Sequence, residues 1–273
     1  MLVSLHFIAV MSEKKPLILV TNDDGAEAKG LKALIEVVRP LGTVYAVVPE
    51  TSQSGMSHAI SVRKPIRVRY RQEVSDGEYH CYTVGGTPVD CVKLALNKLL
   101  PRRPDLVVSG INHGSNASVN LLYSGTMGAA IEGAVNNIRS IGLSLLDYDP
   151  DADFTAAALI GKKLIGQVLA NGYHPDLCLN VNIPALDKKE LKGVRVCRQT
   201  RGYWVEEFEE SHDEQGDRLF ILTGSYTNLE PGHPETDEWA LENGYAAVVP
   251  VEVDHTRYED VDKLRDLNFD LNN

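Results

Sequence analysis

The sequence lacks the cysteine patterns of zinc-binding and disulfide-rich proteins. Its four cysteines are widely separated, and no two of them form a Cys-x-x-Cys pair. Zinc ribbons and dithiol redox motifs need such short spacings, so neither kind of centre is supported. We expect reduced, structural thiols in a cytoplasmic protein. The cysteines are Cys81, Cys91, Cys178 and Cys197.

The chain is also poor in basic residues. It has 27 Lys and Arg against 38 Asp and Glu, which gives a formal net charge of -11 at pH 7. Nucleic acid polymers and anionic membrane surfaces are bound by clustered positive charge, so we expect neither as a partner. A small anionic substrate is still allowed, because one bound cation reverses the local field.

No hydrophobic run is long enough to span a bilayer. The apolar segment 1–10 lacks the basic start and the small-residue cleavage site of a secretory signal, and Lys14 and Lys15 follow it rather than precede it. Met11 precedes a polar lead into the first expected strand, so the true start can be Met1 or Met11. Residues 1–16 are expected to form a disordered extension.

The two common glycine-rich nucleotide cradles are missing as well. No Gly-x-Gly-x-x-Gly follows the first expected strand, and Gly-x-x-x-x-Gly-Lys-Ser/Thr does not occur. Their absence disfavours a non-catalytic nucleotide-binding protein built on a similar sheet. There is no internal repeat or low-complexity linker, and 273 residues can form a single α/β domain.

Short apolar runs rich in β-branched residues alternate with segments of helical periodicity as far as Pro184. This alternation predicts a Rossmann-like, doubly wound, mostly parallel sheet. Segments 60–71 and 78–84, around an Asp-Gly turn, predict a hairpin, and 110–116 is predicted to be a loop. The other expected strands are 18–21, 43–48, 105–109, 140–145 and 178–183, and expected helices include 88–99 and 154–169.

The pattern changes after Pro184. Two extended segments, 193–200 and 218–223, bracket a run rich in glutamate, which predicts a projecting arm over 193–223. A last strand is expected at 245–251. We therefore expect one α/β domain over 17–251, carrying this arm as a C-terminal β-hairpin extension, and an exposed, charged tail over 252–273.

Two adjacent carboxylates, Asp23 and Asp24, end the first expected strand, and Gly25 then permits a tight turn. In a doubly wound sheet, ligands bind where loops leave the carboxyl ends of the strands. The pair is therefore a candidate site facing a crevice. The alternative is a solvated turn, since Asn-Asp-Asp-Gly is also good turn and helix-cap chemistry.

Four separated segments together resemble the SurE survival-protein family of metal-dependent nucleotidases. The resemblance extends over about 17–251 and is strongest before Leu145. Any one segment could arise by chance, whereas four in this order are specific. The segments are 21–25 (TNDDG), 86–92 (GTPVDCV), 109–116 (SGINHGSN) and 123–126 (YSGT).

The resemblance implies one divalent cation per subunit. By similarity to the family, the ligands of this cation would be Asp23, Asp24, the Ser54 hydroxyl and the Asn112 side chain. Hard oxygen donors without a thiolate suit Mg²⁺ or Mn²⁺ better than zinc. Alone, Ser54 and Asn112 would be interpreted as ordinary loop and turn residues.

A helix is expected to open at Ser124, where unpaired N–H groups and the positive end of the helix dipole favour an anion. A plain N-cap is the alternative. Its position after the Asn112 loop favours phosphate binding, and two histidines flank the expected ligands. The residues expected to contact phosphate or substrate are Asn116, Ser124, Gly125, Thr126, His58 and His113.

The implied activity is hydrolysis of nucleoside 5′- and 3′-monophosphates to nucleoside and phosphate. Asp23 and Asp24 are the expected catalytic residues, holding a cation that activates the attacking water. An aspartyl-phosphate route usually has its acids one residue apart, and here they are adjacent. Alternatives on the same site are a broader phosphatase or an exopolyphosphatase. Family extensions of this kind exchange between subunits, so we expect a homodimer or homotetramer.

Overall fold

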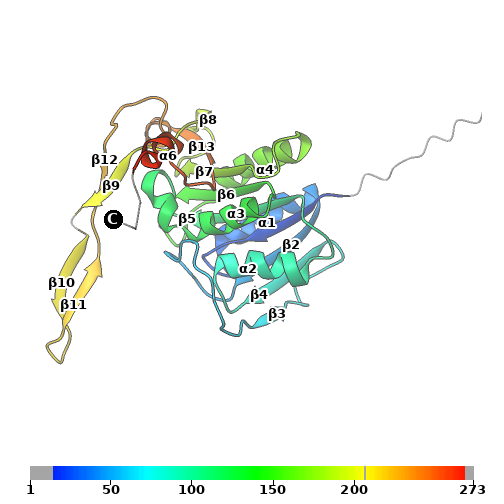
Figure 1. The fold of residues 1–273 in the computed structure, drawn as a ribbon. Helices are drawn as coiled ribbons and strands as arrows, with labels where there is room; N and C mark the ends of the chain where they lie inside the picture. Colours follow the sequence, from blue (N-terminus) through cyan, green and yellow to red (C-terminus); the bar gives the residue numbers. More distant parts are fainter. Residues whose placement is uncertain (1–14, 206, 268–273) are drawn as a thin grey trace, which may run out of the picture.

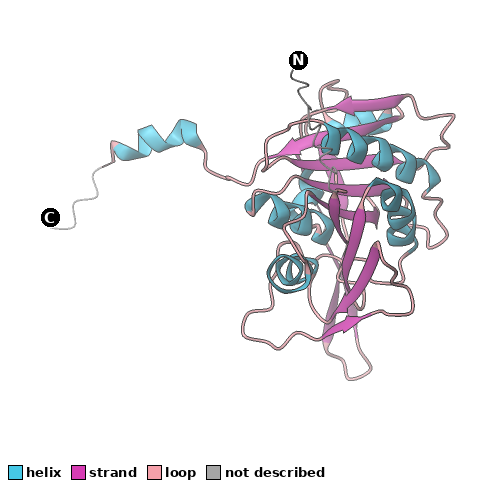
Figure 2. Cartoon of the chain, turned by 90° about the vertical axis from the view of Figure 1, so that its right-hand side faces the viewer, coloured by secondary structure: helices cyan, strands magenta, loops and turns pink. Residues whose placement is uncertain are grey.

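The computed structural model describes residues 15–205 and 207–267. A nine-stranded sheet forms its centre, and helices cover both faces (Figures 1 and 2). This architecture confirms the predicted doubly wound, mostly parallel α/β fold. The N-terminal extension predicted for 1–16 lies outside the described residues up to residue 14. Among the described helices, none combines the length and apolar character needed to cross a membrane.

The strands of the central sheet are β1 Leu17–Thr21, β2 Thr43–Pro49, β3 Val68–Tyr70, β4 Tyr79–Val84, β5 Leu106–His113, β6 Ser140–Leu146, β7 Cys178–Pro184, β8 Gly193–Val196 and β13 Tyr245–Val251. The α-helices are α1 Lys29–Val38, α2 Pro88–Leu94, α3 Gly125–Val135, α4 Thr155–Ala170, α5 Asp237–Glu242 and α6 Tyr258–Arg265. Shorter helical turns are η1 Arg39–Leu41, η2 Ala95–Leu99 and η3 Ser118–Tyr123.

The strand order is β3-β4-β2-β1-β5-β6-β7-β13-β8. All neighbours from β4 to β7 are parallel, whereas β3 and β13 run antiparallel to their inner neighbours β4 and β7. The chain builds outward from β1 in both directions, with β2 on one side and β5 on the other. The carboxyl ends of β1 and β5 therefore form the switch point at which such sheets bind ligands.

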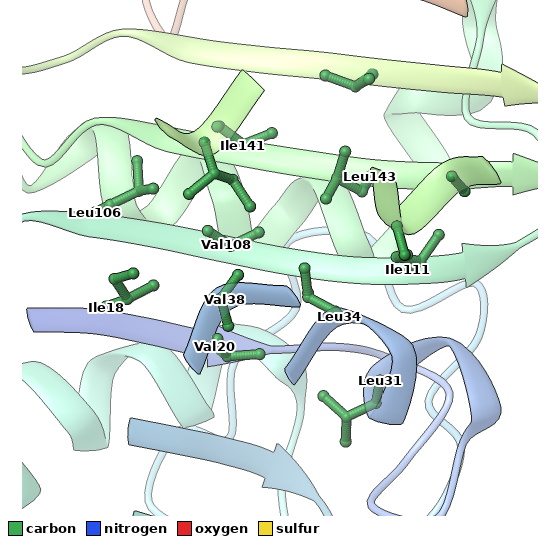
Figure 3. Packing of buried hydrophobic residues seen from close by; sticks show 14 of the residues in the cluster. Ile18, Val20, Leu31, Leu34, Val38, Leu106, Val108, Ile111, Ile141 and Leu143 are labelled. Carbon is green, nitrogen blue, oxygen red and sulfur yellow. The ribbon is translucent and has the colours of Figure 1, made fainter. Parts of the chain in front are cut away.

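Alternate residues of β1 enter two different cores. Ile18 and Val20 pack with α1 and α4 on one face, and Leu19 packs with α2 and α3 on the other. Figure 3 shows the first core, in which Leu34 of α1 lies near residues of β1 and β5. Because both faces are covered, the strand reads as an unbroken apolar run. This packing fixes the position of the residues that follow β1.

Strand β5 is longer than the sequence predicts. The segment 110–116 was expected to be a loop, yet β5 continues to His113, and a β-bulge between Ser109 and Asn112 shifts its register against β6. Its glycine and amide residues are typical of loops, but pairing with β6 overrides that local preference. Asn112 consequently lies on a strand.

Two other elements are shorter than predicted. The helix expected over 88–99 is α-helical only to Leu94 and continues as the wider turn η2. The first strand of the predicted hairpin, 60–71, is reduced to Val68–Tyr70, although it does pair antiparallel with β4. The alternation of apolar residues in 60–67 produces neither a strand nor a buried face: Ile60 and Val62 are exposed, and Ile66 packs against the core on the α2 side of the sheet.

The projecting arm is displaced from the predicted 193–223. Strand β8, within that range, pairs with β13 at the edge of the central sheet, a long-range contact that local sequence patterns do not reveal. The arm consists instead of 202–205 and 207–228, with paired strands β9 Gly202–Val205 and β12 Ser225–Asn228, then β10 Phe208–His212 and β11 Arg218–Leu222. Figure 1 shows these two strand pairs extending away from the central sheet.

We predict that Leu34→Ala will destabilise the protein by about 2 to 5 kcal/mol, because it removes a fully buried side chain and leaves a cavity between α1 and the sheet. Urea unfolding followed by circular dichroism measures the change. The matched control Leu264→Ala, on the exposed surface of α6, should stay within about 0.5 kcal/mol of wild type. Equal effects of the two substitutions would contradict the described core.

Candidate functional site

The carboxylate of Asp23 lies against the start of helix α3. Its side chain is buried, with the residue only 3% exposed, and the Thr126 hydroxyl donates a hydrogen bond to its Oδ1. A Cβ atom added at Gly125 would lie 3.0 Å from its Oδ2 and 2.9 Å from its Cβ. Glycine at this position therefore lets the helix end approach Asp23, where the helix dipole favours negative charge.

The pKa of each acid in the pair is raised above its usual value. Burial raises the pKa of Asp23 to about 6, hydrogen bonding from Thr126 opposes this rise, and the charge of Asp24 adds to it. Burial also raises the pKa of Asp24, against a hydrogen bond from the His113 backbone. A nearby positive charge would relieve both effects, which makes the pair a favourable place for a cation.

The loop that carries Ser54 is docked beside the acids. The backbone N–H of Gln53 donates to the backbone oxygen of Asp23 at 2.7 Å. Gly25, with φ +96°, lies so close to this loop that an added Cβ would be 3.1 Å from the carbonyl carbon of Thr51. Ser54 itself is exposed, and its Oγ lies 3.0 Å from Oγ of Ser52. The hydroxyl thus belongs to a loop anchored at the site.

Strand β5 brings Asn112 and His113 to the same edge of the sheet. The buried Asn112 side chain donates from Nδ2 to the Gly114 oxygen at 3.0 Å, so its Oδ1 is the atom suited to accept or to bind a cation. The backbone N–H of His113 donates to Oδ2 of Asp24 at 3.3 Å. The His113 ring packs edge-on against Phe154, with centroids 4.8 Å apart. Phe154, the N-cap residue of α4, therefore holds the ring, and Asp24 holds the backbone of the same residue.

The oxygen donors at this edge fit a hard divalent cation. Asn22 adds a further candidate, because its Oδ1 is buried and has no hydrogen-bond partner among the described residues. Across 15–205 and 207–267, no group of three or more His, Cys, Asp or Glu side chains is arranged to hold a metal. A cation here would therefore use two carboxylates together with neutral oxygens and water, a set that suits Mg²⁺ or Mn²⁺.

Some of the groups expected to bind phosphate are free to do so, and others are already hydrogen-bonded within the protein. Ser124 is the N-cap of α3, and its Oγ accepts from the Met127 N–H at 3.0 Å. The N–H groups of Gly125 and Thr126 belong to the first helical turn and have no carbonyl partner within the helix. The Thr126 hydroxyl, however, is committed to Asp23. Sequence reasoning identified this helix end without revealing that it also holds Asp23.

Asn116 belongs to a buried hydrogen-bond network that joins the loop after β5 to the central sheet. Its Nδ2 donates to Ser144 Oγ at 2.7 Å, and its backbone N–H donates to Asn182 Oδ1 at 2.8 Å. Its backbone oxygen accepts from Asn180 at 2.7 Å. These contacts attach the loop after β5 to strands β6 and β7. Asn116 therefore has a structural role that its sequence position did not indicate.

His58 was anticipated near the site, but the residues that hold it were not. Its Nε2 lies 3.0 Å from Oε2 of the buried Glu132 on α3, and Lys93 of α2 donates to Oε1 of the same carboxylate at 2.8 Å. The available signal was a single acid among the small residues of α3, because a buried acid needs partners. His58 and Ser124 line one cavity of about 500 Å³, together with Ser57, Leu121, Ile131, Gln199 and Val251.

Comparisons with known proteins agree with this architecture. The family model described as "Survival protein SurE" matches residues 18–206. Proteins named 5′-nucleotidase SurE from Flavobacterium johnsoniae and Cytophaga hutchinsonii are each 48% identical, covering 93% of this chain and 97% and 98% of theirs. The crystal structure of the SurE protein from Aquifex aeolicus superposes with a TM-score of 0.79 at 33% identity, covering 92% of this chain and 98% of its own. The chain belongs to the survival protein SurE family.

Proposed function

We propose that this protein is a phosphomonoesterase that hydrolyses nucleoside 5′- and 3′-monophosphates with the help of one divalent cation. One observation carries the proposal: two acidic side chains follow β1 at the switch point of the sheet, and the N-terminus of α3 abuts the buried one, Asp23. Relatives of this length and similarity are named 5′-nucleotidases, which supports the nucleotide as substrate.

In this proposal Asp23, Asp24, Ser54 and Asn112 hold the cation. A bound Mg²⁺ or Mn²⁺ supplies positive charge to the phosphoryl oxygens and lowers the pKa of water. The chain keeps both carboxylates available for it: Thr126 fixes the orientation of Asp23, and the His113 backbone fixes that of Asp24. Because these groups are positioned before substrate arrives, little reorganisation is needed during the reaction.

The start of α3 binds the phosphate. Its first-turn residues Gly125 and Thr126 lie beside Asp23, and their N–H groups would stabilise the negative charge that develops as the ester bond lengthens. The Ser124 hydroxyl keeps its own hydrogen as an additional donor at this helix end, since its oxygen accepts from the Met127 N–H. The cavity of about 500 Å³ adjoining Ser124 is large enough for the nucleoside part of the substrate.

Asp23→Asn should lower phosphate release by about 100-fold or more, because it removes a charge that fixes the cation and the electrostatics of the transition state. The fold should persist, since the asparagine oxygen can still accept from Thr126. Release is measured from nucleoside 5′- and 3′-monophosphates, short polyphosphate and p-nitrophenyl phosphate. The exposed control Asp262→Asn should keep wild-type rates. Near wild-type turnover by Asp23→Asn would refute the assignment.

Removing the cation with a chelator should abolish phosphate release, and adding back Mg²⁺ or Mn²⁺ singly should restore it. In a thermal shift assay, cation at about 100 times its Kd should stabilise the protein by about 2.7 kcal/mol. A protonated carboxylate is a poor ligand, so the shift should weaken as pH falls through about 6, the raised pKa of Asp23.

Asn112→Ala should reduce that thermal shift without the loss of fold. Full activity and an unchanged melting temperature after thorough metal stripping would contradict the proposed cation.

We also propose that the active form is a homodimer or homotetramer joined through the arm. The β10–β11 pair is an isolated two-stranded sheet, a structure of marginal stability on its own. Its apolar side chains are largely exposed, with Phe208 64% and Leu222 70% accessible to solvent. A second copy of the chain would cover this surface and remove its apolar side chains from water.

Replacing the cross-strand pair Phe208 and Leu222 with serine should dissociate the oligomer, because the double substitution removes apolar area from the proposed interface. Light scattering coupled to size-exclusion chromatography measures the mass. Leu264→Ser, an exposed leucine on α6, is the matched control and should keep the wild-type assembly. A monomeric wild-type protein at micromolar concentration would contradict this assembly.

A further inference from the structure

The imidazole of His58 is oriented by a buried carboxylate. Its Nε2 lies 3.0 Å from Oε2 of Glu132, a residue only 3% exposed. Two further donors, Lys93 Nζ at 2.8 Å and Asn136 Nδ2 at 2.9 Å, fix the other oxygen of Glu132. With the carboxylate held at both oxygens, it accepts the Nε2 proton of His58 and leaves Nδ1 as the ring nitrogen directed elsewhere.

The loop bearing His58 crosses α3 close to the Asp23 contact. A Cβ added at Gly128 would lie 2.3 Å from the Ser57 oxygen and 3.2 Å from the His58 Cα, so the loop touches this helix directly. Gly125, which abuts Asp23, lies one helical turn earlier. Two further contacts secure the loop, from Ser57 to the backbone oxygens of Leu122 and Tyr123.

The ring is also accessible to substrate. The His58 side chain is 37% exposed and lines the cavity of about 500 Å³ that Ser124 borders. Ser124 begins the helix that would hold the phosphate, so a nucleotide bound there places its ester oxygen between the phosphate site and the nucleoside cavity. His58 lines the same cavity as Ser124, so its ring lies on the nucleoside side of that ester oxygen.

We propose that His58 is the general acid of the reaction and that Glu132 is its positioning residue. This inference rests on the proposed function. Water attacks phosphorus, the bond between phosphorus and the ester oxygen breaks, and the electron pair stays on the ribose oxygen. Nδ1 of His58 gives that oxygen its proton, the attacking water loses a proton to solvent, and solvent later reprotonates His58.

The charges around His58 suit this role. Burial raises the pKa of Glu132, but hydrogen bonds from His58 and Lys93 outweigh burial and lower that pKa overall, so the carboxylate is ionised and accepts a hydrogen bond from the ring. Lys93 reaches the same carboxylate from α2. The other titratable or charged groups that line this cavity are Cys197, Arg198, Glu252 and His255.

The leaving group distinguishes a proton donor from a merely structural histidine. A ribose oxygen needs a proton as it departs, whereas p-nitrophenolate departs without one. His58→Asn in the full-length, cation-loaded enzyme should therefore lower kcat for adenosine monophosphate by about 100-fold or more, and for p-nitrophenyl phosphate by less than about threefold. The limb of the pH profile in which activity falls with rising pH should also disappear for the nucleotide.

Glu132→Gln should reproduce the same selectivity more weakly, with about a tenfold loss for the nucleotide and little change in KM. The control His174→Asn, which alters an exposed histidine paired with Asp176, should behave as wild type. Equal losses on both esters, or no loss on either, would overturn the acid role of His58. A wild-type enzyme inactive on both esters would instead contradict the proposed function, and the acid with it.

Discussion

The structure depends on burying the Asp23 carboxylate against the first turn of α3. This contact costs free energy, because burial and the neighbouring Asp24 both oppose ionisation of the side chain. The Thr126 hydroxyl and the helix dipole offset part of the cost. Gly125 makes the approach sterically possible. A strained acid pair of this kind is maintained where a bound positive charge is part of the function.

Helix α3 organises the groups on both sides of the site. Its first turn holds Asp23, its surface at Gly128 receives the loop that carries His58, and Glu132 fixes the ring of that histidine. The small residues that allow these approaches also let α3 pack closely on β5 and β6. One rigid element therefore anchors both the proposed cation site and the loop that carries the proposed proton donor.

The sequence predicted those features of the fold and the site that depend on neighbouring residues in the chain. Alternating strands and helices predict the sheet, and Asp23 follows a buried strand, so its position at a strand end is predictable. Long-range pairing was not predictable: Asn112 lies on β5 because of β6, and β8 joins the central sheet through β13. The contact of Thr126 with Asp23 was also hidden, because it joins side chains about a hundred residues apart. Distances of that kind are set by packing, which local patterns do not encode.

The most direct test of the central claim is the anomalous diffraction signal of Mn²⁺ in crystals of this protein. The account predicts a single strong peak per subunit within coordination distance of Asp23 and Asp24, with Asn112 Oδ1 among its neighbours. A peak located elsewhere, or no peak at saturating Mn²⁺, would contradict it.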